Sequence, residues 1–275
     1  MKKLILLIGL FLSVILFVNT EVFAQGNLIS AKEIAKIMGD DNVVLVSTRK
    51  SGDYAKVHIK DAVNVDLTTL YKSGDIKGIL KSPEEISKEL GAKGINKDKT
   101  IIIYDNGKGI NAGRLYWILE YLGCKDVKIL DGHMKAWRTA KKPVTKYPTK
   151  IKEVTFTPSL DKKIIATYDY VKSNLNNPKV MIVDVQSKKE FDEGHIDGAK
   201  NFEYKNIINE ESGKLKSPEE ITELLKGAGI TPDKEIILYC ATSARAGILF
   251  MAMTSELDYP NVKVYDGAWN EWKTK

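Results

Sequence analysis

Cysteine and histidine are scarce in this chain of 275 residues, which contains two cysteines and three histidines. Two cysteines cannot build the framework of several disulfides that stabilises many small secreted domains. His58 and His195 show no metal-ligand spacing with another histidine or a cysteine, so we expect no metal site. If Cys124 and Cys240 lie in different domains, Cys240 is unpaired, and an unpaired thiol is a candidate for reactivity.

A strong excess of one charge is also absent. The formal net charge is +6, and the lysines are spread along the chain instead of forming a basic arm. This distribution gives no reason to expect a nucleic-acid partner. The composition, 43% hydrophobic and 28% charged, is typical of a soluble globular protein, and the length suffices for two domains. We expect a monomer.

Long apolar runs are missing except at the N-terminus. Lys2 and Lys3 precede the apolar residues 4–18, and Val22-Phe23-Ala24 provides the small-residue pattern that a signal peptidase recognises. We therefore predict a signal peptide over residues 1–24 and an exported mature protein, periplasmic or extracellular, with no stable membrane insertion after cleavage. The alternative is an uncleaved membrane anchor, for which this apolar run is short.

Cys240 stands where a strand ends and a helix begins. The apolar residues 236–238 predict a buried strand, and residues 248–253 predict a helix. The small residues between them allow a tight turn in which several amide N–H groups face a common centre. A thiolate in that turn would be stabilised by those donors, by the start of the helix and by Arg245. The alternative is a small buried apolar residue, the usual role of a free cysteine.

The spacing of Cys240 and Arg245 bears on the chemistry. Five intervening residues would suit a phosphate, as in the cysteine phosphatases, whereas the four present here make a tighter loop that suits one sulfur or a small oxyanion. Cys124, by contrast, lies between a helix-like segment at residues 115–122 and a predicted strand, and no activating loop surrounds it. We therefore predict that Cys124 is structural.

The chain contains two copies of one unit. The segment Leu80–Ile86 recurs 135 residues later as Leu215–Ile221. The same offset relates residues 101–104 to 236–239, Asp131-Gly132 to Asp266-Gly267, and Trp137 to Trp272, while an offset of 137 relates His58 and Asn64 to His195 and Asn201. A period this long indicates duplicated domains and not a solenoid repeat.

Each copy alternates helices with strands, which predicts an α/β fold whose parallel sheet is covered on both faces. In both copies a Ser-Pro pair, at residues 82–83 and 217–218, provides an N-cap and a first-turn proline. The expected elements are helices at 31–38 and 167–174, and strands at 43–47, 180–185, 127–130 and 262–265. We place the domains at residues 27–139 and 164–275, with a Lys-, Pro- and Thr-rich linker at 140–163.

Asp105 of the first copy occupies the position of Cys240 in the second. Aspartate cannot carry sulfur, and its charge repels an anion, so we predict that the first copy is inactive. Its loop, residues 105–110, is rich in glycine. Such a loop can cradle a phosphate, and the alternative is an ordinary turn.

These features resemble the tandem-domain sulfurtransferases of the rhodanese family, over essentially the whole mature chain. In that family the catalytic cysteine opens a six-residue loop, as at residues 240–245, and an inactive first domain carries aspartate at the cysteine position. Gly194–Asn201 resembles the family motif Gly-His-Ile-Pro-Gly-Ala-x-Asn, except that Asp197 replaces the proline, and Val183–Gln186 resembles Val-Asp-Val/Thr-Arg, except that Gln186 replaces the arginine. The Asp-Gly pairs followed by Trp137 and Trp272 resemble the closing motif Gly-Gly-x-x-x-Trp. Arg114 resembles an arginine that precedes aromatic residues in the inactive first domains of the family. The resemblance implies two tandem rhodanese-like domains, each with a central, mostly parallel sheet flanked by helices.

The reaction implied by the resemblance is sulfur transfer without a cofactor. The Cys240 thiolate would take a sulfane sulfur from a small anionic donor, thiosulfate or 3-mercaptopyruvate, and pass it to cyanide or a thiol. The loop would hold the persulfide and Arg245 would orient the donor. The substrate-binding residues of the loop would be Ala241, Thr242, Ser243 and Ala244.

Arg114 and His58 are further substrate-binding candidates. The alternative role for Arg114 is a structural ion pair, and the alternative role for His58 is a structural hydrogen bond.

Two departures from the family pattern leave the donor open. Ser243 stands where the family usually has glycine, and a side chain there is costly if the position needs a positive φ. Ala241 is uncharged where thiosulfate-preferring members often have a basic residue. The alternatives are therefore a non-enzymatic module that carries a persulfide and a phosphatase- or arsenate-reductase-like enzyme, against which the short loop argues.

Overall fold

The computed structural model describes residues 26–275. The predicted signal peptide and its cleavage site lie outside the described residues. Within residues 26–275, no helix has both the length and the apolar character needed to cross a membrane.

The first domain is built on a sheet of five parallel strands in the order β1-β6-β5-β2-β4. The strands are β1 (Leu28–Ile29), β2 (Val43–Ser47), β4 (Val63–Asn64), β5 (Thr100–Tyr104) and β6 (Val127–Leu130). The helices are α1 (Ala31–Ile37), α2 (Ser51–Lys56), α3 (Pro83–Gly91), α4 (Ile110–Tyr121) and α5 (His133–Thr139), with a 3-10 helix at Leu67–Leu70. The central strand β5 is apolar throughout its middle because helices cover both faces of the sheet.

The second domain repeats this order as β8-β12-β11-β9-β10, again all parallel. The strands are β8 (Ile165–Ala166), β9 (Val180–Asp184), β10 (Lys200–Asn201), β11 (Glu235–Tyr239) and β12 (Val262–Tyr265). The helices are α6 (Tyr168–Ser173), α7 (Lys188–Glu193), α8 (Pro218–Gly227), α9 (Ala246–Met251) and α10 (Ala268–Trp272), with a 3-10 helix at Tyr204–Ile207 and a π-helical turn at Ala252–Glu256. The predicted duplication and parallel sheets are confirmed.

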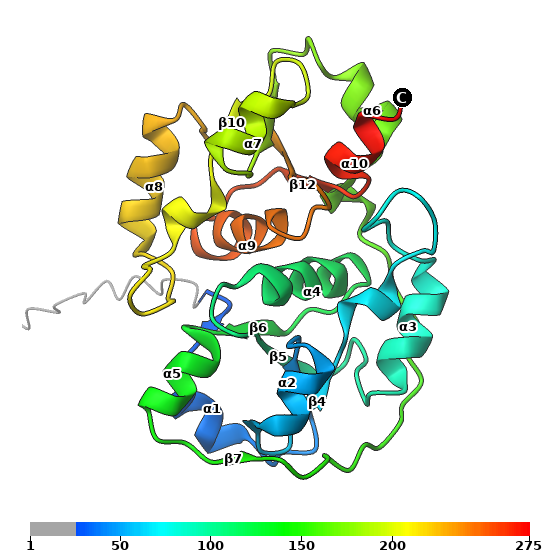
Figure 1. The fold of residues 1–275 in the computed structure, drawn as a ribbon, viewed down its shortest axis with the longest axis vertical. Coiled ribbons are helices and arrows are strands. Elements are labelled where there is room, and N and C mark those ends of the chain that lie inside the picture. Colours follow the sequence, from blue (N-terminus) through cyan, green and yellow to red (C-terminus); the bar gives the residue numbers. More distant parts are fainter. Residues whose placement is uncertain (1–25) are drawn as a thin grey trace, which may run out of the picture.

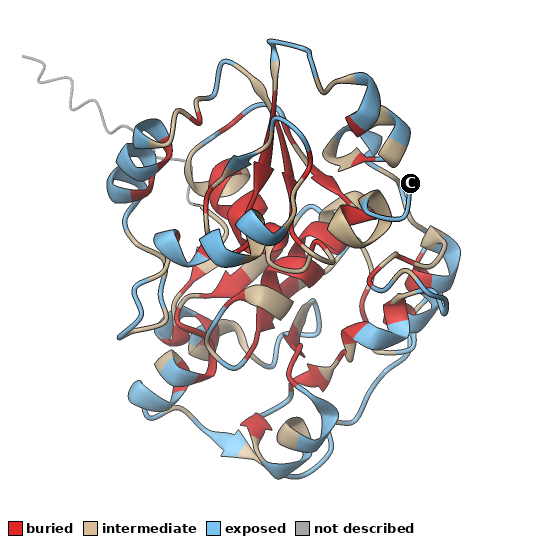
Figure 2. Cartoon of the chain, turned by 45° about the horizontal axis from the view of Figure 1, so that its top comes forward, coloured by how far each residue is buried: buried red, intermediate tan, exposed pale blue. Residues whose placement is uncertain are grey.

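The two domains meet where α4 and α9 lie side by side (Figure 1). A Cβ on Gly113 would lie 2.3 Å from the Ile248 nitrogen, and one on Gly247 would lie 2.3 Å from the Gly113 oxygen, so only glycine allows this approach. Gly113 and Ile248 are equivalent under the offset of 135, so the pseudo-twofold axis of the duplication passes between them. One cluster of buried residues runs through both domains here, and Figure 2 shows buried residues in the sheets and the central helices.

A hairpin from each domain reaches into the other. The Leu80 N–H donates to Asp266 Oδ2 (3.1 Å), and the Leu215 N–H donates to Asp131 Oδ1 (3.3 Å), two contacts that the duplication makes equivalent. The first hairpin is closed by the bridge between Tyr71 and Leu80 and spans ten residues. The second is closed by the bridge between Ile208 and Leu215 and spans eight residues. The change of offset from 137 to 135 therefore falls in these hairpins.

The segment predicted as a linker follows the surface of the first domain. Its strand β7 (Val144–Thr145) pairs antiparallel with β3 (His58–Ile59), which precedes β4. Further along, the Val154 N–H donates to the Gly91 carbonyl at the end of α3 (3.0 Å). The segment then runs up to β8, as its course in Figure 1 shows.

Candidate active site

Cys240 directly follows β11, and the loop that it opens leads into α9. Its side chain is 1% exposed. The main chain at the start of the loop is held by α10, because the Trp269 N–H donates to the Cys240 carbonyl (3.0 Å) and the Asn270 N–H donates to the Ala241 carbonyl (3.1 Å). The carbonyls of this turn are thus directed towards α10.

The amides of the loop are unoccupied. None of the N–H groups of residues 241–245 has a hydrogen-bond acceptor among residues 26–275. Backbone amides removed from solvent normally have a partner, and consecutive free amides in a turn form an anion-binding site. The loop therefore has five free donors next to the only cysteine that lies in such a turn.

Ser243 adopts the left-handed conformation, with φ of 59°, and is fully buried. Its Oγ donates to the carbonyl of Tyr265, the last residue of β12. The position has a positive φ, which is the conformation that explains why the family usually has glycine there. The serine hydroxyl anchors the loop and does not face a ligand. Only the amide of Ser243 is left for a substrate.

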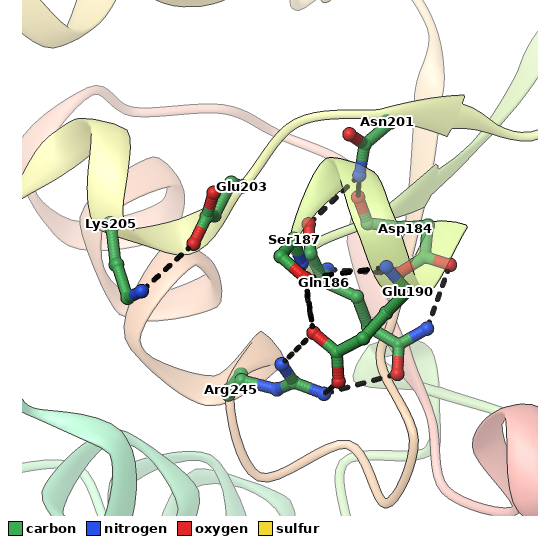
Figure 3. Close-up of polar contacts among 8 residues, drawn as sticks. All are labelled: Asp184, Gln186, Ser187, Glu190, Asn201, Glu203, Lys205 and Arg245. Atoms are coloured by element: carbon green, nitrogen blue, oxygen red, sulfur yellow. Dashed lines mark hydrogen bonds and ion pairs between the residues drawn. The ribbon is translucent and has the colours of Figure 1, made fainter. Parts of the chain in front are cut away.

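Arg245 is within hydrogen-bonding reach of Cys240. Its guanidinium is already paired with side chains of its own domain (Figure 3). Its Nη1 donates to Glu190 Oε2 (2.7 Å), and its Nη2 donates to Glu190 Oε1 (2.9 Å) and to Gln186 Oε1 (3.0 Å). Burial lowers the pKa of Arg245, but Glu190 and a Cys240 thiolate raise it by more, so the guanidinium stays charged. The Arg245 guanidinium in turn lowers the pKa of Glu190 to about 2.

Glu190 and Gln186 are site residues that the sequence did not identify. Glu190 is held at the start of α7, where Ser187 and Glu190 form a capping box. Gln186 is held by Asp184, which accepts from the Gln186 N–H (2.9 Å) and from its Nε2 (3.1 Å). The Ser-x-x-Glu pattern predicts the start of a helix, but nothing in it points to Arg245, which lies 55 residues further along.

Arg114 forms an ion pair between the domains. It is fully buried, and its Nη2 donates to Asp266 Oδ1 and to the Gly78 carbonyl, both at 2.8 Å. Its Nε and Nη1 have no hydrogen-bond partner among residues 26–275, but the guanidinium carbon lies 4.7 Å from the centre of the Trp117 ring. Of the two roles considered for Arg114, the ion pair is the one present in the structure.

The first hairpin covers the cysteine loop. A Cβ on Gly78 would lie 2.7 Å from the Thr242 Cβ and 3.1 Å from the Thr242 carbonyl oxygen, so the hairpin backbone is in direct contact with the loop. Asn270 Nδ2 also donates to the Lys77 carbonyl (3.4 Å). The site is therefore assembled from both domains.

His58 lies in the first domain, away from this loop. It is fully buried, its Nδ1 lies 2.8 Å from the Tyr54 carbonyl, and its ring stacks on Tyr54 with centroids 3.8 Å apart. His195 makes the same two contacts with Phe191, at 2.8 Å and 3.7 Å. Because both copies use the histidine in the same way, these contacts belong to the fold, and the structure does not bring His58 together with Cys240.

The first-domain loop uses its own carboxylate. Asp105 Oδ1 accepts from the Gly107 N–H (2.6 Å) and from the Gly109 N–H (3.3 Å). Both glycines have positive φ. Two of the amides that could have cradled a phosphate are therefore already bonded to a carboxylate of the chain itself.

Cys124 differs from Cys240 in its surroundings. It is 2% exposed, and burial raises its pKa to about 12, so it is a protonated thiol at neutral pH. Both cysteines are free, and no group of three potential metal ligands occurs among residues 26–275.

Comparison with known proteins connects this architecture to characterised ones. The Rhodanese-like domain profile matches residues 30–140 and 167–275. The 3-mercaptopyruvate sulfurtransferase of Escherichia coli K12 is 27% identical over 266 residues, covering 89% of this chain and 94% of that protein. The sulfur carrier protein TtuD of Thermus thermophilus is 31% identical over 274 residues, covering 83% of this chain and 93% of that protein. The crystal structure of SseA from Escherichia coli superposes with a TM-score of 0.83 at 27% identity, covering 89% of this chain and 99% of that one.

Proposed function

The chain belongs to the rhodanese-like family and is a sulfurtransferase, and from this premise we propose that it moves sulfane sulfur through a persulfide on Cys240. The observation that carries the proposal is the set of free amides at residues 241–245, next to a cysteine and an arginine. Donors of the thiosulfate or 3-mercaptopyruvate type and acceptors such as cyanide or a thiol fit this chemistry. Export is part of the proposal and rests on the sequence of residues 1–24.

The first step forms the persulfide. With thiosulfate, the Cys240 thiolate attacks the outer sulfur, the S–S bond of the donor breaks, and sulfite leaves with the bonding pair. With 3-mercaptopyruvate, the thiolate attacks the thiol sulfur, the C–S bond breaks, and the pair goes to the enolate of pyruvate, which then takes a proton. The free loop amides stabilise the negative charge that accumulates on the outer sulfur of Cys240.

The second step regenerates the free Cys240 thiolate. Cyanide attacks the outer sulfur of the persulfide, thiocyanate leaves, and the bonding pair remains on Cys240 as a thiolate. A thiol acceptor takes the same sulfur as a persulfide of its own. Atoms and electrons balance in both steps with the chain and the two substrates alone.

A carrier role is the second candidate, because one relative is named a sulfur carrier protein. In that case Cys240 would hold a persulfide for a protein partner and would turn over small acceptors poorly. The phosphatase-like alternative has no comparable support, since four residues separate Cys240 from Arg245 and the matching family is rhodanese-like.

Thiocyanate formation from thiosulfate or 3-mercaptopyruvate and cyanide tests the proposal. We expect Cys240→Ser to lose at least about a thousandfold in kcat/KM, because the nucleophile is removed. Cys124→Ser is the matched control and should keep full activity. Turnover retained in Cys240→Ser would refute the proposal, and a persulfide on Cys240 seen by mass spectrometry without thiocyanate formation would favour the carrier role.

A further inference from the structure

The positive charges around Cys240 are already neutralised. Arg245 is bidentate to Glu190, and Arg114, across the domain interface, is paired with Asp266 at 2.8 Å. Burial raises the pKa of Tyr71, the Arg114 charge opposes this shift, and negative charges on Asp266 and Cys240 add to it, so Tyr71 lies close enough to feel all three groups. The two ion pairs add no net charge to the site before a donor arrives.

Glu190 is the outer member of its pair. Its side chain is 40% exposed, and that of Arg245 is 20% exposed. A donor that needs the Arg245 guanidinium must therefore displace the Glu190 carboxylate or bind beside it. Because two like charges repel strongly at contact distance, each extra negative charge on the donor makes binding beside Glu190 less favourable.

We propose that Glu190 is a specificity-determining residue, an internal counter-anion that competes with the donor for Arg245 and selects monoanionic sulfane-sulfur donors over dianionic ones. The inference rests on the proposed function of Cys240 and refines its substrate class. Thiosulfate, with two charges, would be a poor donor, whereas a thiosulfonate, in which one charged oxygen is replaced by a carbon group, would be a good one. The thiosulfonate step balances as before: the thiolate attacks the outer sulfur, the S–S bond breaks and a sulfinate leaves with the pair.

Glu190→Gln isolates the charge from the structure around it. Glutamine at this position can still complete the capping box with Ser187 and can still accept one hydrogen bond from Arg245 through its single oxygen. The substitution therefore removes the negative charge and the second of the two hydrogen bonds that Arg245 donates to Glu190. Glu220 provides a matched control. It holds the same third position of a capping box with Ser217 in α8 and has no ion-pair partner among residues 26–275.

The experiment measures kcat/KM for thiosulfate and for methanethiosulfonate, with cyanide as acceptor, in wild type, Glu190→Gln, Glu190→Asp and Glu220→Gln. We expect wild type to prefer methanethiosulfonate, and Glu190→Gln to raise kcat/KM for thiosulfate about tenfold while changing that for methanethiosulfonate much less. Glu190→Asp keeps the charge and should keep the wild-type preference, as should Glu220→Gln. The ratio of the two donors within one preparation does not depend on the folded fraction.

An unchanged donor ratio in Glu190→Gln, or a wild-type preference for thiosulfate, would overturn this inference alone. Turnover of either donor by Cys240→Ser would instead overturn the proposed function. The two failures are thus distinguishable with the same assay.

Discussion

The loops that follow β5 and β11 occupy equivalent places in the two domains, yet their amides are used differently. In the first loop, the N–H groups of Gly107 and Gly109 bond to the carboxylate of Asp105. Under the offset of 135, these residues correspond to Thr242 and Ala244, whose N–H groups have no acceptor among residues 26–275. The two loops also turn differently, because Gly107 and Gly109 have positive φ in the first loop, whereas Ser243, equivalent to Lys108, has positive φ in the second. Amides of the first loop are thus bonded from within, and those of the second are left open.

This difference indicates that the second loop has amides available to an anion. Asp105 shows that a loop at this place in the fold can hold a negative charge through its amides. We expect the outer sulfur of a Cys240 persulfide to accept in the same manner from the free amides of residues 241–245.

Cys240→Asp should give the second loop a carboxylate at the position where the first loop has one. Activity should fall at least about a thousandfold, because the nucleophile is lost and the amides bind a fixed carboxylate. The variant should nevertheless be at least as stable as Cys240→Ser, since the new carboxylate can accept from loop amides that are otherwise free. Thiocyanate formation and urea unfolding followed by circular dichroism measure the two effects.

The expectation that the second loop can hold a carboxylate would be wrong if Cys240→Asp were less stable than Cys240→Ser by more than about 2 kcal/mol. A loss of that size is typical of a buried charge that has no hydrogen-bond donors. Such a result would mean that the amides of residues 241–245 do not converge on the position of the side chain.

Much of the fold could be predicted from the sequence because its signals are local. The strands β2, β6 and β12 have the predicted bounds, and both Ser-Pro pairs begin helices with the predicted caps. The duplication was visible because paired motifs recur at a fixed offset. Cys240 and its loop were predicted from the strand–loop–helix pattern and the spacing to Arg245, and the repetition placed Asp105 at the equivalent position, where it predicts an inactive first copy.

The remainder of the site depends on contacts between distant residues. Glu190 meets Arg245 across 55 positions, and Arg114 meets Asp266 across 152. No periodicity or motif encodes such pairs, so Arg245 was expected to be free for a donor, and Arg114 could not be assigned between two roles. The placement of Gly78 on Thr242 likewise depends on how the two domains pack.

Asp105→Ala tests the first loop on its own. We expect the free energy of unfolding to fall by about 1–3 kcal/mol, because the amides of Gly107 and of the buried Gly109 lose their acceptor. Asp105→Asn keeps a carbonyl acceptor and should lose less. Cys240→Ala, at the equivalent position, should have a smaller effect than Asp105→Ala, since no loop amide depends on the cysteine side chain in the free protein. Urea unfolding of the three variants measures the order, and a Cys240→Ala loss larger than that of Asp105→Ala would contradict it.

The smallest expected effect concerns Ser243, which gives the second loop a side chain at a left-handed position. Ser243→Ala removes the hydrogen bond to the Tyr265 carbonyl and keeps the unfavourable φ, so we expect a loss of about 1–2 kcal/mol in the free energy of unfolding. Ser243→Gly removes the same bond but relieves the φ, so it should be more stable than Ser243→Ala by about 1 kcal/mol. Both variants should lower kcat/KM by a few-fold, because the hydroxyl fixes the backbone whose amides, in the proposed mechanism, hold the sulfur. Urea unfolding and thiocyanate formation on the pair separate the two contributions. If Ser243→Ala proved as stable as Ser243→Gly, then the left-handed conformation would carry no penalty, and the anchoring bond alone would explain the serine.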